Sequence, residues 1–438
     1  MKRLNRWARR SALVVSVLGV GALAAGNVAA GGGGAVAAAA GRRAAPAAGK
    51  KSPITVAWLA TLTGADAADG MAQVKGFKLG LGVFGDTVDG HKIEASYLNS
   101  ESTPTIALSA AKRAVETYHA SVILGPLLGN LLAAVAPYVL SRDVPQLTYA
   151  TSGYTQIKAD VQSKAGFVTG YTPTQVATEG AKWAYDTMHW HHITTLADDY
   201  NYGWESVGGF DKEFTKLGGR ITKTIWVPVT RADVSTYVSE IPSTTQAVFT
   251  ELLGPQGTNF YSQMKAYGLT TKVGVLGMAS TIDQSVLSTV TVAAATAPKS
   301  YGVSQYCTEI SGKVNKAFTT AYHKAYGVWP TGLSESAYTD AEILVSALKK
   351  MDGVIKSEKE LANVLASVKV VAPVGPFSIT RATYAPLENV YLCKIEDKTG
   401  SARDVPIRIY KDVHPWGLLS ISTWKKTFTS DTTSRPSA

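Results

Sequence analysis

The chain has 438 residues, of which 45% are hydrophobic and 17% are charged, a composition typical of a globular protein with two or three domains and not of a disordered one. The formal net charge is +10, but residues 1–51 contain nine Lys and Arg and no acidic side chain, which leaves 34 basic against 33 acidic side chains in the remainder. Because the body of the chain is nearly neutral, the high pI does not indicate a nucleic-acid partner, and we expect none.

Residues 1–51 have the features of an export signal and a linker. A basic segment, residues 2–10, precedes an apolar stretch, residues 11–26, that is short and glycine-rich for a membrane span. We expect cleavage after Ala30 or within residues 35–37, followed by a flexible linker. An uncleaved anchor is the alternative, and the pair Arg9-Arg10 leaves both the general and the twin-arginine export routes open. We therefore expect a soluble, periplasmic mature protein.

From residue 54 onward, short apolar strands alternate with segments of helical periodicity. This alternation predicts parallel βαβ units and a doubly wound sheet. The expected strands are residues 54–59, 91–98, 121–125 and 145–149, and the expected helices are residues 70–84, 103–118 and 130–140.

The same rhythm resumes at residue 174 and predicts a second α/β unit. Its expected helices are residues 174–188, 203–217 and 258–269, and its expected strands are residues 191–197, 220–229, 246–252 and 272–278. The last third mixes helices at residues 311–327, 333–351 and 358–367 with strands at residues 388–395 and 406–410. We predict an α/β fold of two lobes. Lobe 1 comprises residues 52–168 and 301–381, and lobe 2 comprises residues 169–300 and 382–438.

Two short motifs are weak indicators of a nucleotide site or a metal site. The segment Gly80 to Gly85 matches the dinucleotide pattern GxGxxG, but it ends a helical run far from any preceding strand, so we expect no nucleotide site. His189, His191 and His192 lie at a helix end without a carboxylate or Cys at useful spacing, so we expect no metal site there. We expect no cofactor. The only cysteines, Cys307 and Cys393, could pair in an oxidising compartment, but their spacing does not decide it.

Four loops at the ends of expected strands carry hydroxyl, acidic and glycine residues. They are residues 61–70, 125–130, 148–153 and 198–203. Ligands bind at the carboxyl ends of such strands, and helix starts there favour an anion such as a carboxylate. Turn and cap chemistry alone is the alternative for any one loop. A catalytic serine would need a base and an orienting acid, which no local pattern supplies, so we expect no enzymatic activity.

The order and spacing of these segments resemble the type I periplasmic solute-binding proteins of ABC importers, in the branched-chain amino acid (Leu/Ile/Val) group. The likeness covers residues 53–395 and rests on segments 54–70, 122–139, 144–153, 198–205, 247–269 and 374–379. It implies two lobes joined by three crossing strands that close on a solute. It also implies a small-molecule solute, a permease of an ABC importer as partner, and a monomer.

The resemblance also implies the ligand-binding residues. The loop Leu127 to Asn130 and the loop Ala150 to Ser152 would hold the ligand's carboxylate, with a main-chain carbonyl from Ala150 and the hydroxyl and N–H of Ser152. Tyr200 or Tyr202 and the segment Leu253 to Gly257 would close over the ligand from the second lobe. The expected ligand-binding residues are thus Leu128, Gly129, Asn130, Ala150, Thr151, Ser152, Tyr200, Tyr202, Leu253 and Gly254.

Two departures from the family pattern leave the ligand open. The first-lobe loop has no Ser near Leu128, and no acidic residue stands near Ala279, where amino-acid binders hold the amino group. Glu251, Asp199 and Asp283 are the possible substitutes. Residues 253–260 also resemble relatives that bind aromatic carboxylates. We expect a small amino or carboxylic acid as the solute; a sensor subunit of a membrane receptor and a secreted hydrolase are the alternatives.

Overall fold

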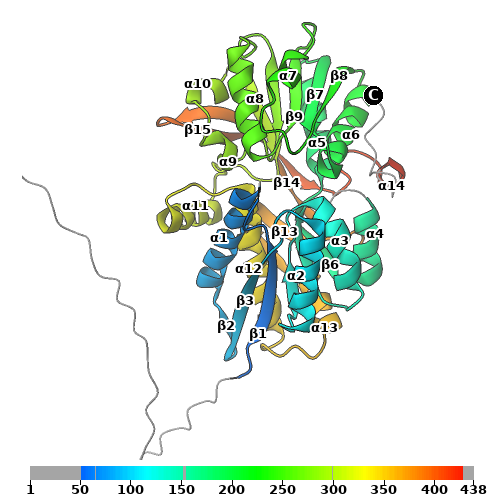
Figure 1. Ribbon diagram of the computed structural model, residues 1–438, viewed down its shortest axis with the longest axis vertical. Helices are drawn as coiled ribbons and strands as arrows, with labels where there is room; N and C mark the ends of the chain where they lie inside the picture. Colours follow the sequence, from blue (N-terminus) through cyan, green and yellow to red (C-terminus); the bar gives the residue numbers. More distant parts are fainter. Residues whose placement is uncertain (1–50, 65, 151–153, 298, 428–438) are drawn as a thin grey trace, which may run out of the picture. The chain divides into compact units, whose positions relative to one another are not determined.

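The computed structural model describes residues 51–64, 66–150, 154–297 and 299–427 (Figure 1). The predicted export signal lies outside these residues, and of the predicted linker only Lys51 is described. Among the described residues, no helix is both long and apolar enough to cross a membrane.

The first sheet has six strands in the order β2-β3-β1-β4-β5-β6. All neighbouring pairs are parallel except β2 and β3. The strands are β1 (Ile54–Ala60), β2 (Thr87–Val88), β3 (His91–Asn99), β4 (Val122–Leu124), β5 (Gln146–Ala150) and β6 (Gly166–Tyr171). The central strands β1 and β4 are almost wholly buried, which is why they read as unbroken apolar runs in the sequence.

The second sheet follows the order β12-β13-β14-β11-β10-β9-β7-β8, with β15 pairing with β14. Strands β8, β7, β9, β10 and β11 are parallel, and β14 is antiparallel to β11. The strands are β7 (His192–Asp198), β8 (Arg220–Val227), β9 (Ala247–Glu251), β10 (Gly274–Met278), β11 (Ser300–Ser304), β12 (Lys369–Ala372), β13 (Gly375–Ile379), β14 (Pro386–Lys398) and β15 (Ser401–Val413).

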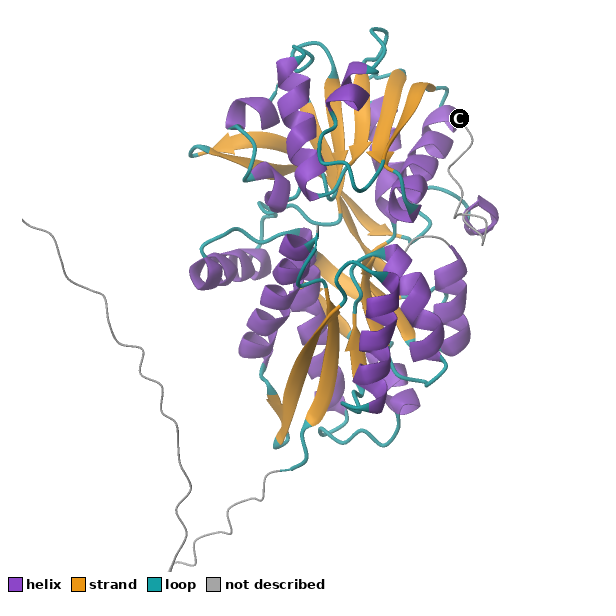
Figure 2. Cartoon of the chain, viewed as in Figure 1, coloured by secondary structure: helices purple, strands orange, loops and turns teal. Residues whose placement is uncertain are grey.

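Helices flank both sheets, as Figure 2 shows by colour. Those packed on the first sheet or on each other beside it are α1 (Ala67–Phe84), α2 (Pro104–Glu116), α3 (Gly129–Leu140), α4 (Tyr154–Ser163), α11 (Lys313–Tyr326), α12 (Gly332–Lys350) and α13 (Glu358–Leu365). Those beside the second sheet are α5 (Pro173–Asp186), α6 (Asn201–Lys216), α7 (Ser235–Ser239), α8 (Gly254–Ala266), α9 (Gln284–Leu287) and α10 (Val292–Ala295). The last described helix is α14 (Ile421–Thr427).

From β6 to β14 the described part of the chain passes between the two sheet regions three times, and beyond β15 the buried Trp424 of α14 packs with Ile157 of α4 and Val168 of β6. The chain leaves the first region after β6, returns between β11 and α11, and leaves it again between β13 and β14. Strand β14 itself contacts both regions, because Pro386 and Leu387 pair with β13 whereas residues 391–394 pair with β11. The predicted α/β fold of two doubly wound lobes is therefore confirmed.

Several helices and strands of the structure were not predicted from the sequence. Strand β6, with the sequence GFVTGY, contains two glycines and reads as a turn, yet it is fully buried beside β5. Helix α4 and strands β12 and β13 were also not predicted. Tertiary packing overrides weak local propensity at these places.

Buried aromatic pairs anchor the helices to each sheet. Trp58 of β1 meets Phe77 of α1 edge to face, with ring centroids 5.1 Å apart. Phe210 of α6 stacks on Phe249 of β9 at 4.1 Å. All four side chains are fully buried, so each pair lies within a close-packed hydrophobic core.

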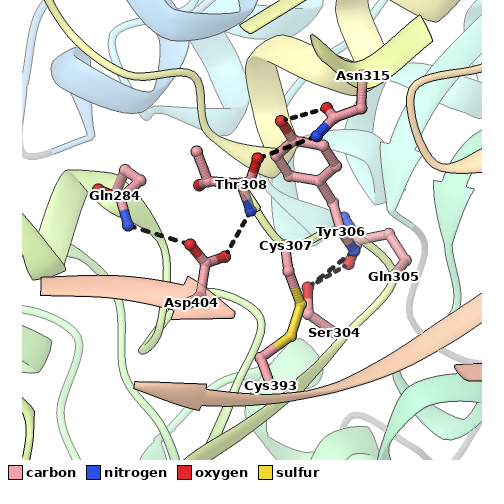
Figure 3. The surroundings of a disulfide bond; sticks show 9 residues. All are labelled: Gln284, Ser304, Gln305, Tyr306, Cys307, Thr308, Asn315, Cys393 and Asp404. Atoms are coloured by element: carbon pink, nitrogen blue, oxygen red, sulfur yellow. Dashed lines mark hydrogen bonds between the residues drawn. A yellow bond between two sulfur atoms is a disulfide. The ribbon is translucent and has the colours of Figure 1, made fainter. Parts of the chain in front are cut away.

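Cys307 and Cys393 form a disulfide, which decides the pairing that the sequence left open (Figure 3). Cys393 belongs to β14, Cys307 follows β11, and both are fully buried. Beside them Asp404 of β15 accepts hydrogen bonds from the Thr308 N–H at 2.9 Å and from Gln284 Nε2 at 3.1 Å. The disulfide therefore fastens the connection between β11 and α11 to the long β14–β15 hairpin.

Helices α1 and α12 touch backbone to backbone, which gives a first prediction. A Cβ atom at Gly76 would lie 2.0 Å from the Ser334 carbonyl oxygen, so the two helices would have to separate. Gly76→Ala is expected to destabilise the fold by about 1–3 kcal/mol. Gly82, in the same helix, has no atom within 4 Å of its would-be Cβ, and Gly82→Ala should be neutral or stabilising by up to about 1 kcal/mol.

Urea denaturation of the two variants and the parent gives the comparison directly. Equal stability of Gly76→Ala and Gly82→Ala would contradict this prediction, because it would mean that α12 moves away from residue 76 with little loss of stability.

Candidate ligand-binding site

A cavity lies among the carboxyl ends of β5, β6, β7, β9 and β10 and the helices that follow them. Both sheet regions contribute to its wall. It is lined by Asp69, Leu127, Leu128, Gly129, Tyr149, Tyr171, Tyr200, Tyr202, Leu253, Gly254, Ala279, Ser280, Asp283, Ser285 and Leu333.

Three helices begin at this cavity. Leu128, Tyr200 and Leu253 are the residues that precede the first turns of α3, α6 and α8, and none of them caps its helix with a side-chain hydrogen bond. The first N–H groups of a helix lack partners within the helix and carry the positive end of its dipole. The cavity wall therefore offers positions suited to a carboxylate.

Four tyrosines form the aromatic part of the wall. Gln305 donates a hydrogen bond from Nε2 to the Tyr149 hydroxyl at 2.7 Å, and Tyr149 meets Tyr171 edge to face at 5.4 Å. The hydroxyls of Tyr171 and Tyr202 are hydrogen-bonded, and the Tyr200 ring lies 6.0 Å from the Tyr202 ring. Residues from β5, β6 and α6 are thus linked across the cavity, and burial holds the pKa of each tyrosine well above its ordinary value.

Two carboxyl groups line the same cavity. Burial, followed by the nearby charges of Asp283 and Asp66, raises the pKa of Asp69 to about 7. Burial also raises the pKa of Asp283 to about 6. Asp283 caps α9 by accepting from the Ser285 N–H at 2.8 Å, and it accepts from the Gly332 N–H of α12 at 3.0 Å. Asp283 therefore holds two helix starts against the cavity.

Of the three acidic substitutes considered in the sequence, Asp283 lines the cavity and Glu251 lies behind its wall. Ser280 donates from Oγ to Glu251 Oε1 at 2.6 Å, whereas Glu251 Oε2 has no hydrogen-bond partner among the described residues. Asp199 is not part of the lining; its Oδ1 accepts from Trp204 Nε1 at 2.9 Å.

The structure brings together most of the predicted site residues that it describes. Leu128, Gly129, Tyr200, Tyr202, Leu253 and Gly254 line the cavity. Asn130 lines an adjoining cavity instead. Ala150 ends β5, but its side chain is not described, and Thr151 and Ser152 lie outside the described residues.

The ligand-binding residues expected from the sequence did not include Asp69, Tyr149, Tyr171, Ser280, Ser285 or Leu333, although Asp69 and Tyr149 belong to the loops 61–70 and 148–153 that the sequence singled out. Tyr149 and Tyr171 lie at the ends of two neighbouring parallel strands, so the missed strand β6 also hid Tyr171. Leu333 lies in the first turn of α12, far along the chain, and no local pattern points to it.

The weaker motifs have structural positions. The GxGxxG segment lies at the end of α1, not between a strand and a helix, as predicted. His191 is exposed beside β7. In the described part of the chain, no cluster of three or more His, Cys, Asp or Glu could hold a metal ion.

Comparison with known proteins gives a family match. The sequence profile of a family described as "Periplasmic binding protein" matches residues 53–401. A search of curated proteins found no match.

Many solved structures are similar to this chain. A solute-binding protein of an ABC transporter from Rhodopseudomonas palustris BisB5, in complex with 3,4-dihydroxybenzoic acid, has a TM-score of 0.78 and 25% identity over 83% of this chain and 98% of that chain. One from R. palustris in complex with 4-hydroxybenzoate has a TM-score of 0.76 and 22% identity over 84% and 100%. A leucine-binding protein from Thermotoga maritima has a TM-score of 0.69 and 19% identity over 82% and 99%. The last two likenesses concern the fold alone.

Proposed function

Because the chain belongs to the periplasmic binding protein family, we propose that it captures a small amino acid or other small carboxylic acid between two lobes and delivers it to the permease of an ABC importer. The observation that supports this proposal most directly is the cavity, to which both sheet regions contribute and at which α3, α6 and α8 begin. The relatives named above, with hydroxybenzoates and leucine among their ligands, support this ligand class.

The proposal assigns the carboxylate to two loops of the first lobe. Leu128, Gly129 and the start of α3 form one side, and Ala150, Thr151 and Ser152 form the other. Tyr200, Tyr202, Leu253 and Gly254 cover the ligand from the second lobe. We take lobe 1 as residues 52–168 and 301–381 and lobe 2 as the remaining residues beyond 168, except that the whole of β6 (Gly166–Tyr171) belongs with the first sheet and β11 (Ser300–Ser304) with the second. The protein works as a monomer in the periplasm after export, and it binds its ligand without turning it over.

A thermal-shift screen over amino acids, hydroxybenzoates and other small carboxylates tests this function. A ligand that binds only the folded state stabilises it by about 2.7 kcal/mol at a hundredfold excess over Kd. Gly129→Val should lose the response, because Gly129 lines the cavity and a valine side chain there would occupy space that the ligand needs; its Cβ atom would also displace the Asn201 side chain, whose Nδ2 lies 2.7 Å away. Gly82→Ala, which alters open surface, should keep it. A panel without any shift would contradict the proposal, and so would turnover of a bound compound.

A further inference from the structure

A second cavity adjoins the first. The two cavities share Leu128, Tyr200 and Leu253 in their linings, so these three residues form the boundary between them. The second cavity also has walls from both sheet regions. Asp66, which precedes α1, contributes one carboxyl group, and Asp198, at the end of β7, contributes the other.

The Asp198 carboxyl group is only partly hydrogen-bonded. It is fully buried, and its Oδ2 accepts from the Leu253 N–H at 3.0 Å. Its Oδ1 has no hydrogen-bond partner of normal geometry among the described residues. Burial raises the pKa of Asp198 to about 8, an effect that Leu253 and the Gln256 side chain only partly offset. A buried carboxylate oxygen without a donor is costly unless a partner arrives.

The described residues around Asp198 supply no cation. Asp198 ends β7 beside Glu251 of β9, and its charge raises the pKa of Glu251, whereas the charge of Asp66 raises the pKa of Asp198. No Lys, Arg or His is among the described residues that line either cavity. No ion pair in the described part of the chain involves Asp66, Asp198 or Glu251. The second cavity is therefore an acidic site without a cation of its own.

We propose that the ligand extends from the first cavity past Tyr200 into the second, and that its end there is an ammonium or guanidinium group held between Asp66 and Asp198. This rests on the proposed function, since the carboxylate of the same ligand occupies the helix starts of the first cavity. The ligand is thus a small carboxylic acid with a basic group at its far end. The Tyr200 ring at the boundary suits a passing cation as well.

The acidic lining of the second cavity disfavours two other kinds of ligand, an anionic group and a bare metal ion. An anionic ring substituent in the second cavity would face two acidic side chains and no cation. A bare divalent cation needs about six oxygen ligands, and Asp66 already accepts from Ser102 Oγ at 3.1 Å through one of its oxygens. An organic cation can be held by two carboxyl groups alone.

Isothermal titration calorimetry with two matched ligand pairs tests the inference. Lysine and norleucine differ in the terminal ammonium, and arginine and citrulline differ in the charge of nearly isosteric end groups. At least one basic member should bind about tenfold more tightly than its uncharged partner, or better, as a charge-assisted hydrogen bond requires.

Neutral variants locate the effect. Asp198→Asn keeps an oxygen for the Leu253 N–H and removes the charge, and it should abolish the preference for the basic ligand while leaving the binding of its uncharged partner within about threefold. Asp66→Asn, at a half-buried position, should reduce the same preference. Asp211→Asn is the matched control: it neutralises an acid of α6 whose pKa is also raised to about 8 but which lines neither cavity, so the preference should remain.

The outcomes separate the inference from the proposed function. Equal or tighter binding of the uncharged member in both pairs, or tighter binding of 4-hydroxybenzoate than of either basic ligand, would overturn the cationic site and leave the solute-binding function standing. A preference for lysine or arginine that survives in both Asp198→Asn and Asp66→Asn would also overturn it. If no small carboxylate binds at all, the proposed function fails, and this inference fails with it.

Discussion

Replacing both Cys307 and Cys393 with alanine is expected to lower the free energy of unfolding by about 4.6 kcal/mol, because the disulfide closes a loop of 86 residues in the unfolded chain. The chain-entropy account gives this value for a loop of that length. Alanine is the better replacement here, since a serine hydroxyl at either fully buried position would need a hydrogen-bond partner.

Equilibrium denaturation of the oxidised parent, the reduced parent and the double variant measures the effect. Reductant should destabilise the parent and leave the double variant unchanged. Each single alanine variant should match the double variant to within about 1 kcal/mol. A double variant as stable as the oxidised parent would show that packing around β14, and not the cross-link, supplies the stability at this place.

Replacing Ser152 with alanine is expected to weaken ligand binding about 10- to 150-fold. The proposed site gives the Ser152 hydroxyl to the ligand carboxylate, and hydrogen bonds to charged groups contribute about 1.5–3 kcal/mol. The stability of the unliganded protein should hardly change, because the proposal gives the Ser152 hydroxyl a role in ligand binding only. Thr155→Ala, a few residues further along, should cost much less if Thr155 serves only the turn into α4.

Titration calorimetry with the ligand found by the screen compares the two variants. Equal affinities of Ser152→Ala and the parent would place the carboxylate elsewhere, with the loop Leu127 to Asn130 as the next position to mutate. A comparable loss in both variants would indicate that the whole loop changes its structure.

The α/β fold could be predicted because its parallel strands are buried on both faces. Such strands appear as short apolar runs, and the helices between them have a clear period, as in β1 and α2. Strand β6 could not be recognised, because a six-residue segment with two glycines has little local preference and becomes a strand only beside β5.

The residues of the candidate site also divide into those that could be predicted from the sequence and those that could not. Leu128, Tyr200 and Leu253 follow recognisable strands, so their place at the carboxyl edge could be expected. Asp69 lies in the candidate loop 61–70, but nothing in the sequence singles it out within that loop, and it belongs to the first turn of α1 in the structure. Leu333 reaches the cavity from helix α12, and helical sequence alone does not say which turn meets a cavity. The disulfide also required the fold, because two cysteines 86 residues apart pair only if their strands meet.

The backbone contact between α1 and α12 limits how this protein can diverge. A Cβ at Gly76 would strike the Ser334 carbonyl, and one at Gly80 would lie 2.6 Å from the Ala341 Cβ. These two glycines are one helical turn apart and face the same side, whereas Gly82 faces open space. Sequence drift along the part of α1 that contacts α12 should therefore be uneven, with two fixed positions separated by one turn and a freely varying one two residues later. Homologues that lose either fixed glycine should carry compensating changes in α12.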